Sequence, residues 1–109
     1  MPAERLKPIY SSRRDDSSDG DAIDRFVIQL GERIDELQDA ETDGDLTLLA
    51  ALASELTGEA DTAGYGAFVR CAKLLEDACL AGDTEDARDR LLDLTEIAQR
   101  IRLGHRGAS

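Results

Sequence analysis

Residues 46–64, LTLLAALASELTGEADTAG, decide the fold because their apolar side chains recur at helical spacing. Steps of three and four residues place side chains on one face of an α-helix. A single apolar stripe is typical of an amphipathic helix that buries one face and leaves the other in water. The apolar positions of this stripe are Leu46, Leu49, Leu52, Ala53, Leu56 and Ala60.

The same spacing recurs three more times along the chain. An upstream helix is expected to begin at an N-cap residue, Asp21, and to end at Gly44. A third helix is expected over residues 65–80. A fourth is expected to begin after an Asp83 cap and to end at Gly104, because glycine is common just beyond a helix.

Length and composition favour one helical domain. The chain has 109 residues, within the roughly 100–200 residues of an ordinary domain, and its apolar content comes mostly from Leu, Ala and Ile. Leucine and alanine have high helix propensity, and the two prolines lie at positions 2 and 8, ahead of every expected helix. The sequence therefore predicts an all-α, antiparallel up-down-up-down four-helix bundle over residues 22–104.

Two short tails are expected to flank the bundle. Residues 11–21 contain no apolar side chain, so they cannot bury enough surface to offset the chain entropy lost on ordering. We therefore expect residues 1–21 to form a disordered, polar and acidic tail. Residues 105–109 are expected to form a short C-terminal tail.

The charge excludes several classes of partner. Thirteen Lys and Arg residues against 24 Asp and Glu residues give a net charge of −11. Binding to nucleic acid or to an anionic membrane rests on Lys and Arg, so neither is expected. There is no apolar run of about 18 residues and no signal-peptide stretch, which favours a cytoplasmic location.

The usual catalytic and metal-binding sets are missing from the sequence. No histidine lies in the expected helices, and no glycine-rich phosphate loop occurs. Cys71 and Cys79 are eight residues apart, about 12 Å along one helix, which is too far for a disulfide. Together with His105 they do not make a zinc ligand set. We expect no catalytic residue, no metal and no cofactor.

Residues 52–64 resemble the core motif of the histidine-containing phosphotransfer (HPt) domain. That motif contains alanine, histidine, any residue, leucine, lysine and glycine, with a further glycine ten residues after the histidine. Ala53, Leu56, Gly58 and Gly64 match it. The resemblance covers about residues 22–103 and implies a four-helix bundle that takes part in phosphorelay.

Two positions depart from the family pattern. Ser54 stands where the resemblance places the phosphorylated histidine, and Thr57 stands at the lysine. A serine hydroxyl without an adjacent base is a weak nucleophile, and threonine supplies no charge to phosphoryl oxygens. Glu55, Glu59 and Asp61 make this region more negative. The resemblance thus implies a pseudo-phosphotransferase that keeps the scaffold and loses the chemistry.

The resemblance implies that the chain binds a receiver domain or a histidine kinase of a two-component system without carrying phosphate. Because receiver active sites are acidic, local cations such as Arg25, Arg33 or Arg70 would assist docking. The partner, the pathway and the oligomeric state are not fixed by the sequence. The expected docking residues are Ser54, Glu55, Gly58, Asp61, Arg25 and Arg33.

Several alternatives are open from the sequence. The chain could be a helical interaction or oligomerisation module unrelated to phosphorelay. It could also be an active phosphotransfer protein with an atypical acceptor, Ser54 or His105. Gly58 costs about 1 kcal/mol of helix stability relative to alanine. That cost is explained by a docking partner that approaches closely, by close packing within the chain, or by a frayed helix end.

Overall fold

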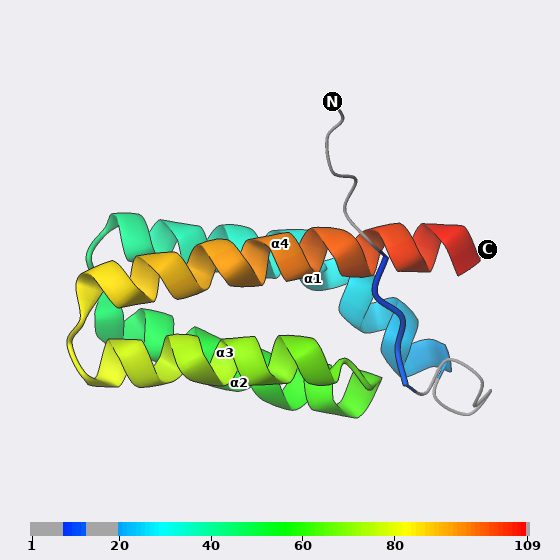
Figure 1. Cartoon of the computed structure of the whole chain (residues 1–109), viewed down its shortest axis with the longest axis horizontal. Helices are drawn as coiled ribbons and strands as arrows, with labels where there is room; N and C mark the ends of the chain where they lie inside the picture. Colours follow the sequence, from blue (N-terminus) through cyan, green and yellow to red (C-terminus); the bar gives the residue numbers. More distant parts are fainter. Residues whose placement is uncertain (1–7, 13–19, 109) are drawn as a thin grey trace.

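The computed structural model describes residues 8–12 and 20–108 and contains four antiparallel helices (Figure 1). This confirms the expected all-α four-helix bundle. The first helix begins at Gly20, one residue before the expected Asp21 cap, and Tyr65 caps the third helix instead of starting it. The helices are α1 (Gly20–Thr42), α2 (Leu46–Ala63), α3 (Gly66–Leu80) and α4 (Thr84–Ala108).

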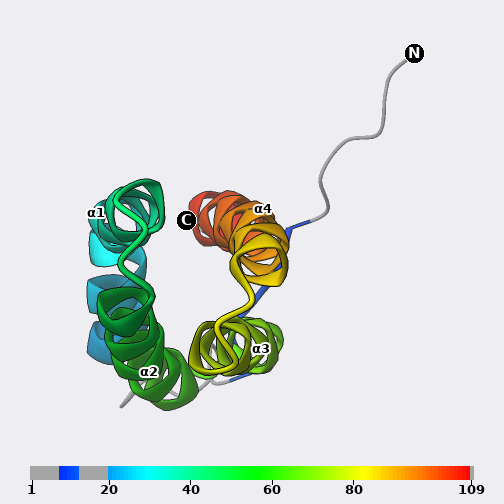
Figure 2. The ribbon, with the colours of Figure 1, turned by 90° about the vertical axis from the view of Figure 1, so that its left-hand side faces the viewer.

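The four helices close into a ring around one core. Each helix packs against its neighbour in the chain, and α1 also packs against α4, as the end-on view shows (Figure 2). The stripes expected from the sequence supply the core, because each helix turns its apolar face inward. The largest fully buried side chains are Phe68, Leu30, Leu37, Leu49, Leu56, Leu75, Leu94 and Ile101.

The three turns between helices follow from glycine and aspartate. Gly44, Gly64 and Gly82 have φ values of 73°, 85° and 75°, a left-handed conformation that side chains with a Cβ rarely adopt. The Asp45 and Asp83 carboxylates each accept a hydrogen bond from the backbone N–H three residues later, at 3.0 Å. These side-chain caps satisfy helix N–H groups that otherwise lack partners. The expected Asp83 cap is thereby confirmed.

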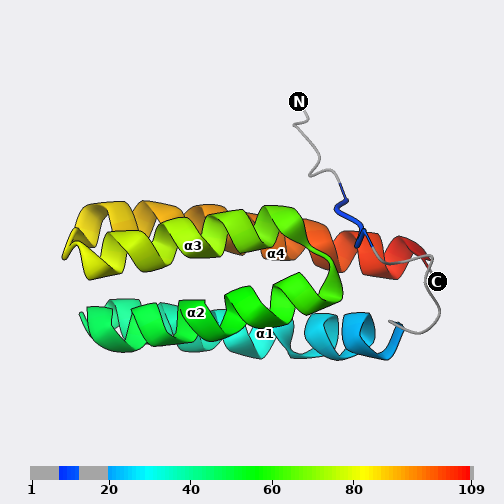
Figure 3. The ribbon, with the colours of Figure 1, turned by 90° about the horizontal axis from the view of Figure 1, so that it is seen from below.

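A short strap, residues 8–12, lies against the bundle near the turn between α2 and α3 (Figures 1 and 3). The buried Ser11 hydroxyl donates a hydrogen bond to the Ala63 carbonyl. The Ser12 N–H donates to the Gly64 carbonyl at 2.9 Å. Residues 8–12, which the sequence assigns to the expected tail, thus have polar groups with partners on the bundle. The remainder of that tail, residues 1–7 and 13–19, lies outside the described residues.

The other end of the strap explains Gly104. The Ile9 N–H donates to the Arg100 carbonyl at 2.9 Å, and a Cβ on Gly104 would collide with the Ile9 carbonyl. Gly104 does not end the helix, because α4 continues to Ala108. The expected stop at Gly104 is wrong. The glycine serves close approach between two backbones instead of a C-cap.

Replacing Gly104 with alanine is expected to displace the strap. The added Cβ would occupy the space of the Ile9 carbonyl, so the Ile9 hydrogen bond to Arg100 must break. A hydrogen bond of this kind contributes on the order of 1 kcal/mol, and we expect the Ile9 amide to exchange with solvent about fivefold faster. Amide hydrogen exchange measures this directly. Unchanged protection of Ile9 would contradict the assignment.

Candidate functional site

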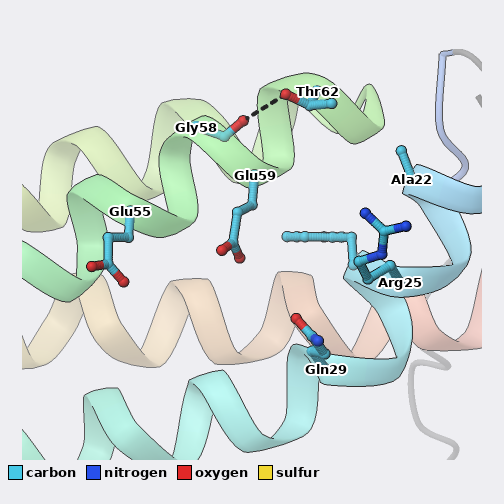
Figure 4. A pocket seen from close by; sticks show the side chains of 8 residues that line it. Ala22, Arg25, Gln29, Glu55, Gly58, Glu59 and Thr62 are labelled. Atoms are coloured by element: carbon cyan, nitrogen blue, oxygen red, sulfur yellow. Dashed lines mark hydrogen bonds between the residues drawn. The ribbon is translucent and has the colours of Figure 1, made fainter.

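An open pocket of about 440 Å³ lies between α1 and α2, and we call it the α1–α2 groove (Figure 4). One wall comes from the first three turns of α1 and the other from the second half of α2. Its residues recur at helical spacing on both helices, so each helix presents one edge to it. The lining residues are Ala22, Arg25, Phe26, Gln29, Glu55, Gly58, Glu59 and Thr62.

Gly58 forms the open part of the α2 wall. It is exposed, and a Cβ built on it would meet no atom within 4 Å. It lies inside α2, which continues to Ala63, and its φ is not positive. Close packing within the chain and a frayed helix end therefore do not explain this glycine. Because Gly58 has no side chain, the backbone of α2 is exposed to the groove at this position.

The hydroxyl groups near Gly58 differ in their partners. The Thr57 hydroxyl donates to the Ala53 carbonyl at 2.9 Å, and the Thr62 hydroxyl donates to the Gly58 carbonyl at 3.1 Å. Both are thus bound to their own helix. Ser54 is exposed, and its hydroxyl makes no hydrogen bond with any described residue. Among the described side chains, no base is bonded to it to activate it.

Arg33 joins α1 to α2 beside the groove. Its guanidinium donates to Glu59 at 2.9 Å and lies 3.8 Å from Glu55, both on α2. It also lies 3.6 Å from Glu36 on its own helix. Single exposed ion pairs contribute little, but one partly buried arginine shared by three carboxylates forms a network across the two helices. The charge of Arg33, an expected docking cation, is therefore already compensated within the chain.

Arg25 lines the groove, and its environment differs from that of Arg33. It is exposed, and it forms no ion pair or hydrogen bond with any described residue. Figure 4 shows its guanidinium between α1 and the end of α2 that carries Thr62. Of the other expected docking residues, Glu55 and Gly58 line the groove, while Ser54 and Asp61 lie exposed on α2.

The floor of the groove is aromatic. Phe26 is 5% exposed and stacks on Tyr65 with ring centroids 5.4 Å apart. Its ring also meets Phe68 edge-on at 5.5 Å. Burial, with a smaller contribution from the charge of Asp24, raises the pKa of Tyr65. Three of the four aromatic residues of the chain thus hold the start of α1 against the α2–α3 turn.

Sequence reasoning did not place five lining residues in the site. Ala22, Phe26 and Gln29 lie on the α1 edge, and Glu59 and Thr62 lie on α2 beyond Gly58. The steps of three and four residues that join them were visible in the sequence. Which edge of α1 would face Gly58 depends on how the two helices pack, so spacing alone does not identify them.

The two cysteines lie away from the groove as free, buried thiols. Burial, with a smaller effect of the Asp93 charge, raises the pKa of Cys71 to about 11, and burial also raises that of Cys79. Since the thiolate is the nucleophile, both are inert near neutral pH. In the described part of the chain, no three His, Cys, Asp or Glu side chains form a metal-binding group. The His105 side chain lies outside the described residues.

Comparison with known proteins identifies a family for this arrangement. The family model described as "Hpt domain" matches residues 21–104, which include α2 and α3 entirely and most of α1 and α4. Searches of curated proteins and of solved structures give no significant match. Within residues 8–12 and 20–108, no helix has the length and apolar character needed to span a membrane.

Proposed function

Because the chain belongs to the Hpt domain family of phosphorelay signalling modules, we propose that it docks onto a two-component partner without carrying phosphate. Hpt domains interact with two-component system proteins, which makes a receiver domain or a histidine kinase the partner class. The observation that carries the docking role is Gly58. It is an exposed glycine inside a helix that lines a groove, and a Cβ built on it would meet no atom of the described residues within 4 Å.

The chemistry around Ser54 supports the loss of phosphotransfer. We infer that Ser54 occupies the position of the phosphorylated histidine, as the motif resemblance implies. Its exposed hydroxyl has no base bonded to it among the described residues, and a neutral hydroxyl is a weak nucleophile. Thr57 stands at the position of the family lysine and carries no charge. Its hydroxyl donates a hydrogen bond to the Ala53 carbonyl. The negative charge of the neighbouring Glu55 carboxylate would repel a phosphoryl group.

The geometry around Gly58 supports a docking face that is kept although phosphotransfer is lost. A glycine inside a helix costs about 1 kcal/mol relative to alanine, and no contact with another described residue offsets that cost here. A partner backbone that approaches α2 closely would need this position to lack a side chain. Such a module acts by competing for, or scaffolding, the surface that an active phosphotransfer domain would use.

Titration against purified receivers and histidine kinases of the same organism tests the proposal. We expect at least one of them to bind the full chain. We also expect no label on the chain after incubation with a radiolabelled phosphorylated receiver, because Ser54 lacks an activating base. Absence of any association would overturn the docking role. Label that is retained, and is lost in Ser54→Ala or His105→Ala, would overturn the non-catalytic assignment.

A further inference from the structure

The two arginines of α1 that border the groove differ in whether their charge is compensated. Arg33 lies within 4 Å of three carboxylates and donates to Glu59 at 2.9 Å. Arg25 lines the groove, is exposed and has no ion pair or hydrogen bond with a described residue. Of the charged residues lining the groove, Glu55 and Glu59 thus lie near a cation, whereas Arg25 has no anion among the residues that the structure describes.

The net charge of the chain gives Arg25 a defined role. At −11, the chain as a whole repels an acidic partner surface at long range. Close to the groove, Arg33 reduces the repulsion from Glu55 and Glu59, and Arg25 adds an attractive charge. A carboxylate of the partner would form a charge-assisted, two-pronged pair with an unpaired guanidinium. A basic side chain at the same place would face Arg25 directly.

The shape of the groove indicates which partner groups lie beside the carboxylate that pairs with Arg25. The floor is the buried ring of Phe26, and the α2 wall at Gly58 has no side chain. A volume of about 440 Å³ lies in the range of pockets that hold a small group or a large side chain. An apolar side chain of the partner would contact Phe26, and the partner backbone would pass over Gly58.

We propose that Arg25 determines which partner docks, by pairing with a carboxylate that the partner presents next to an apolar side chain seated over Phe26. This inference rests on the proposed function, because it names the chemistry that the same docking face recognises. It selects an acidic and apolar protein surface over a basic one. Arg33 acts differently, as an intramolecular bridge that keeps the two glutamates of α2 occupied.

Two charge reversals of equal size test the role of Arg25. Arg25→Glu and Lys73→Glu change the net charge by the same amount, and Lys73 is exposed on α3, outside the groove. The probe is the receiver or kinase domain that the unmodified chain binds in titration. We expect Arg25→Glu to weaken binding about tenfold or more and Lys73→Glu to change it less than about twofold. Replacing the partner carboxylate with lysine should restore binding to Arg25→Glu.

The outcomes separate this inference from the function on which it rests. Equal binding of the two variants would overturn the role of Arg25 and leave the docking function standing. Tighter binding by Arg25→Glu would also overturn it, because the partner would then present a basic residue. If the unmodified chain binds no receiver and no kinase, the proposed function fails and the inference fails with it. Arg25 and Lys73 are both exposed and have no polar partner among the described residues, so both variants should melt at the temperature of the parent chain.

Discussion

Phe26→Ala is expected to lower the free energy of unfolding by about 3–5 kcal/mol. The ring is 5% exposed and contacts Tyr65 and Phe68, so its removal loses apolar burial and two aromatic pairs and leaves a cavity. Total stability of a domain this size is on the order of 5–15 kcal/mol, so the loss is a large fraction of the whole. Urea denaturation followed by circular dichroism measures it.

Two matched variants show whether the aromatic floor is responsible. Phe26→Leu keeps most of the apolar volume and is expected to cost clearly less than the alanine variant. Ile28→Ala removes an apolar side chain from the same helix, but that side chain is 76% exposed, so we expect a change within about 0.5 kcal/mol. A loss below about 1 kcal/mol for Phe26→Ala would contradict the packing described here.

The fold could be predicted because its signals are local. The stripe through Leu49 and Leu56 repeats with the period of one helix, and the Asp83 cap acts on a backbone group three residues away. Such patterns depend on neighbours within a turn or two of the chain. With four stripes and short turns, few arrangements other than an antiparallel bundle bury every apolar face.

The strap could not be predicted because its partners lie far along the chain. The Ser11 hydroxyl bonds to a carbonyl 52 residues away. Ile9 of the same strap packs against the core, and the sequence around it does not show where on the bundle that side chain lies. The role of Gly104 could not be predicted for a related reason. A glycine near the end of a helix is a common stop signal, and only the position of the Ile9 backbone shows that it serves close approach.

The candidate site was predictable only in part on both helices. Gly58 follows from the motif, and its exposure agrees with a docking face. Arg25 and Arg33 carry the same charge on the same helix, so the sequence does not distinguish them. The difference arises from Glu59, 26 residues from Arg33, which lies within hydrogen-bonding distance only when α1 and α2 pack together. The ion pair between α1 and α2 that distinguishes Arg33 from Arg25 therefore follows from the structure and not from the sequence.

Gly58→Arg is expected to weaken docking about a hundredfold, equivalent to about 2.7 kcal/mol, without destabilising the chain. A Cβ at this position meets open space and φ is not positive, so the helix accommodates a side chain. Arginine is a good helix former, and stability should rise by up to about 1 kcal/mol. The long side chain then occupies the space that the partner backbone needs. Calorimetric titration and thermal melting give the two quantities on one sample.

Two further variants separate bulk from charge and from helix stability. Gly58→Ala gives about the same gain in stability while adding only a methyl group, so its loss of binding should be much smaller than that of arginine. Ala81→Arg adds the same charge at the exposed C-cap of α3, outside the groove, and should leave binding unchanged. If Gly58→Arg binds as tightly as Ala81→Arg, no partner approaches α2 here, and the cost of a glycine inside this helix has another cause.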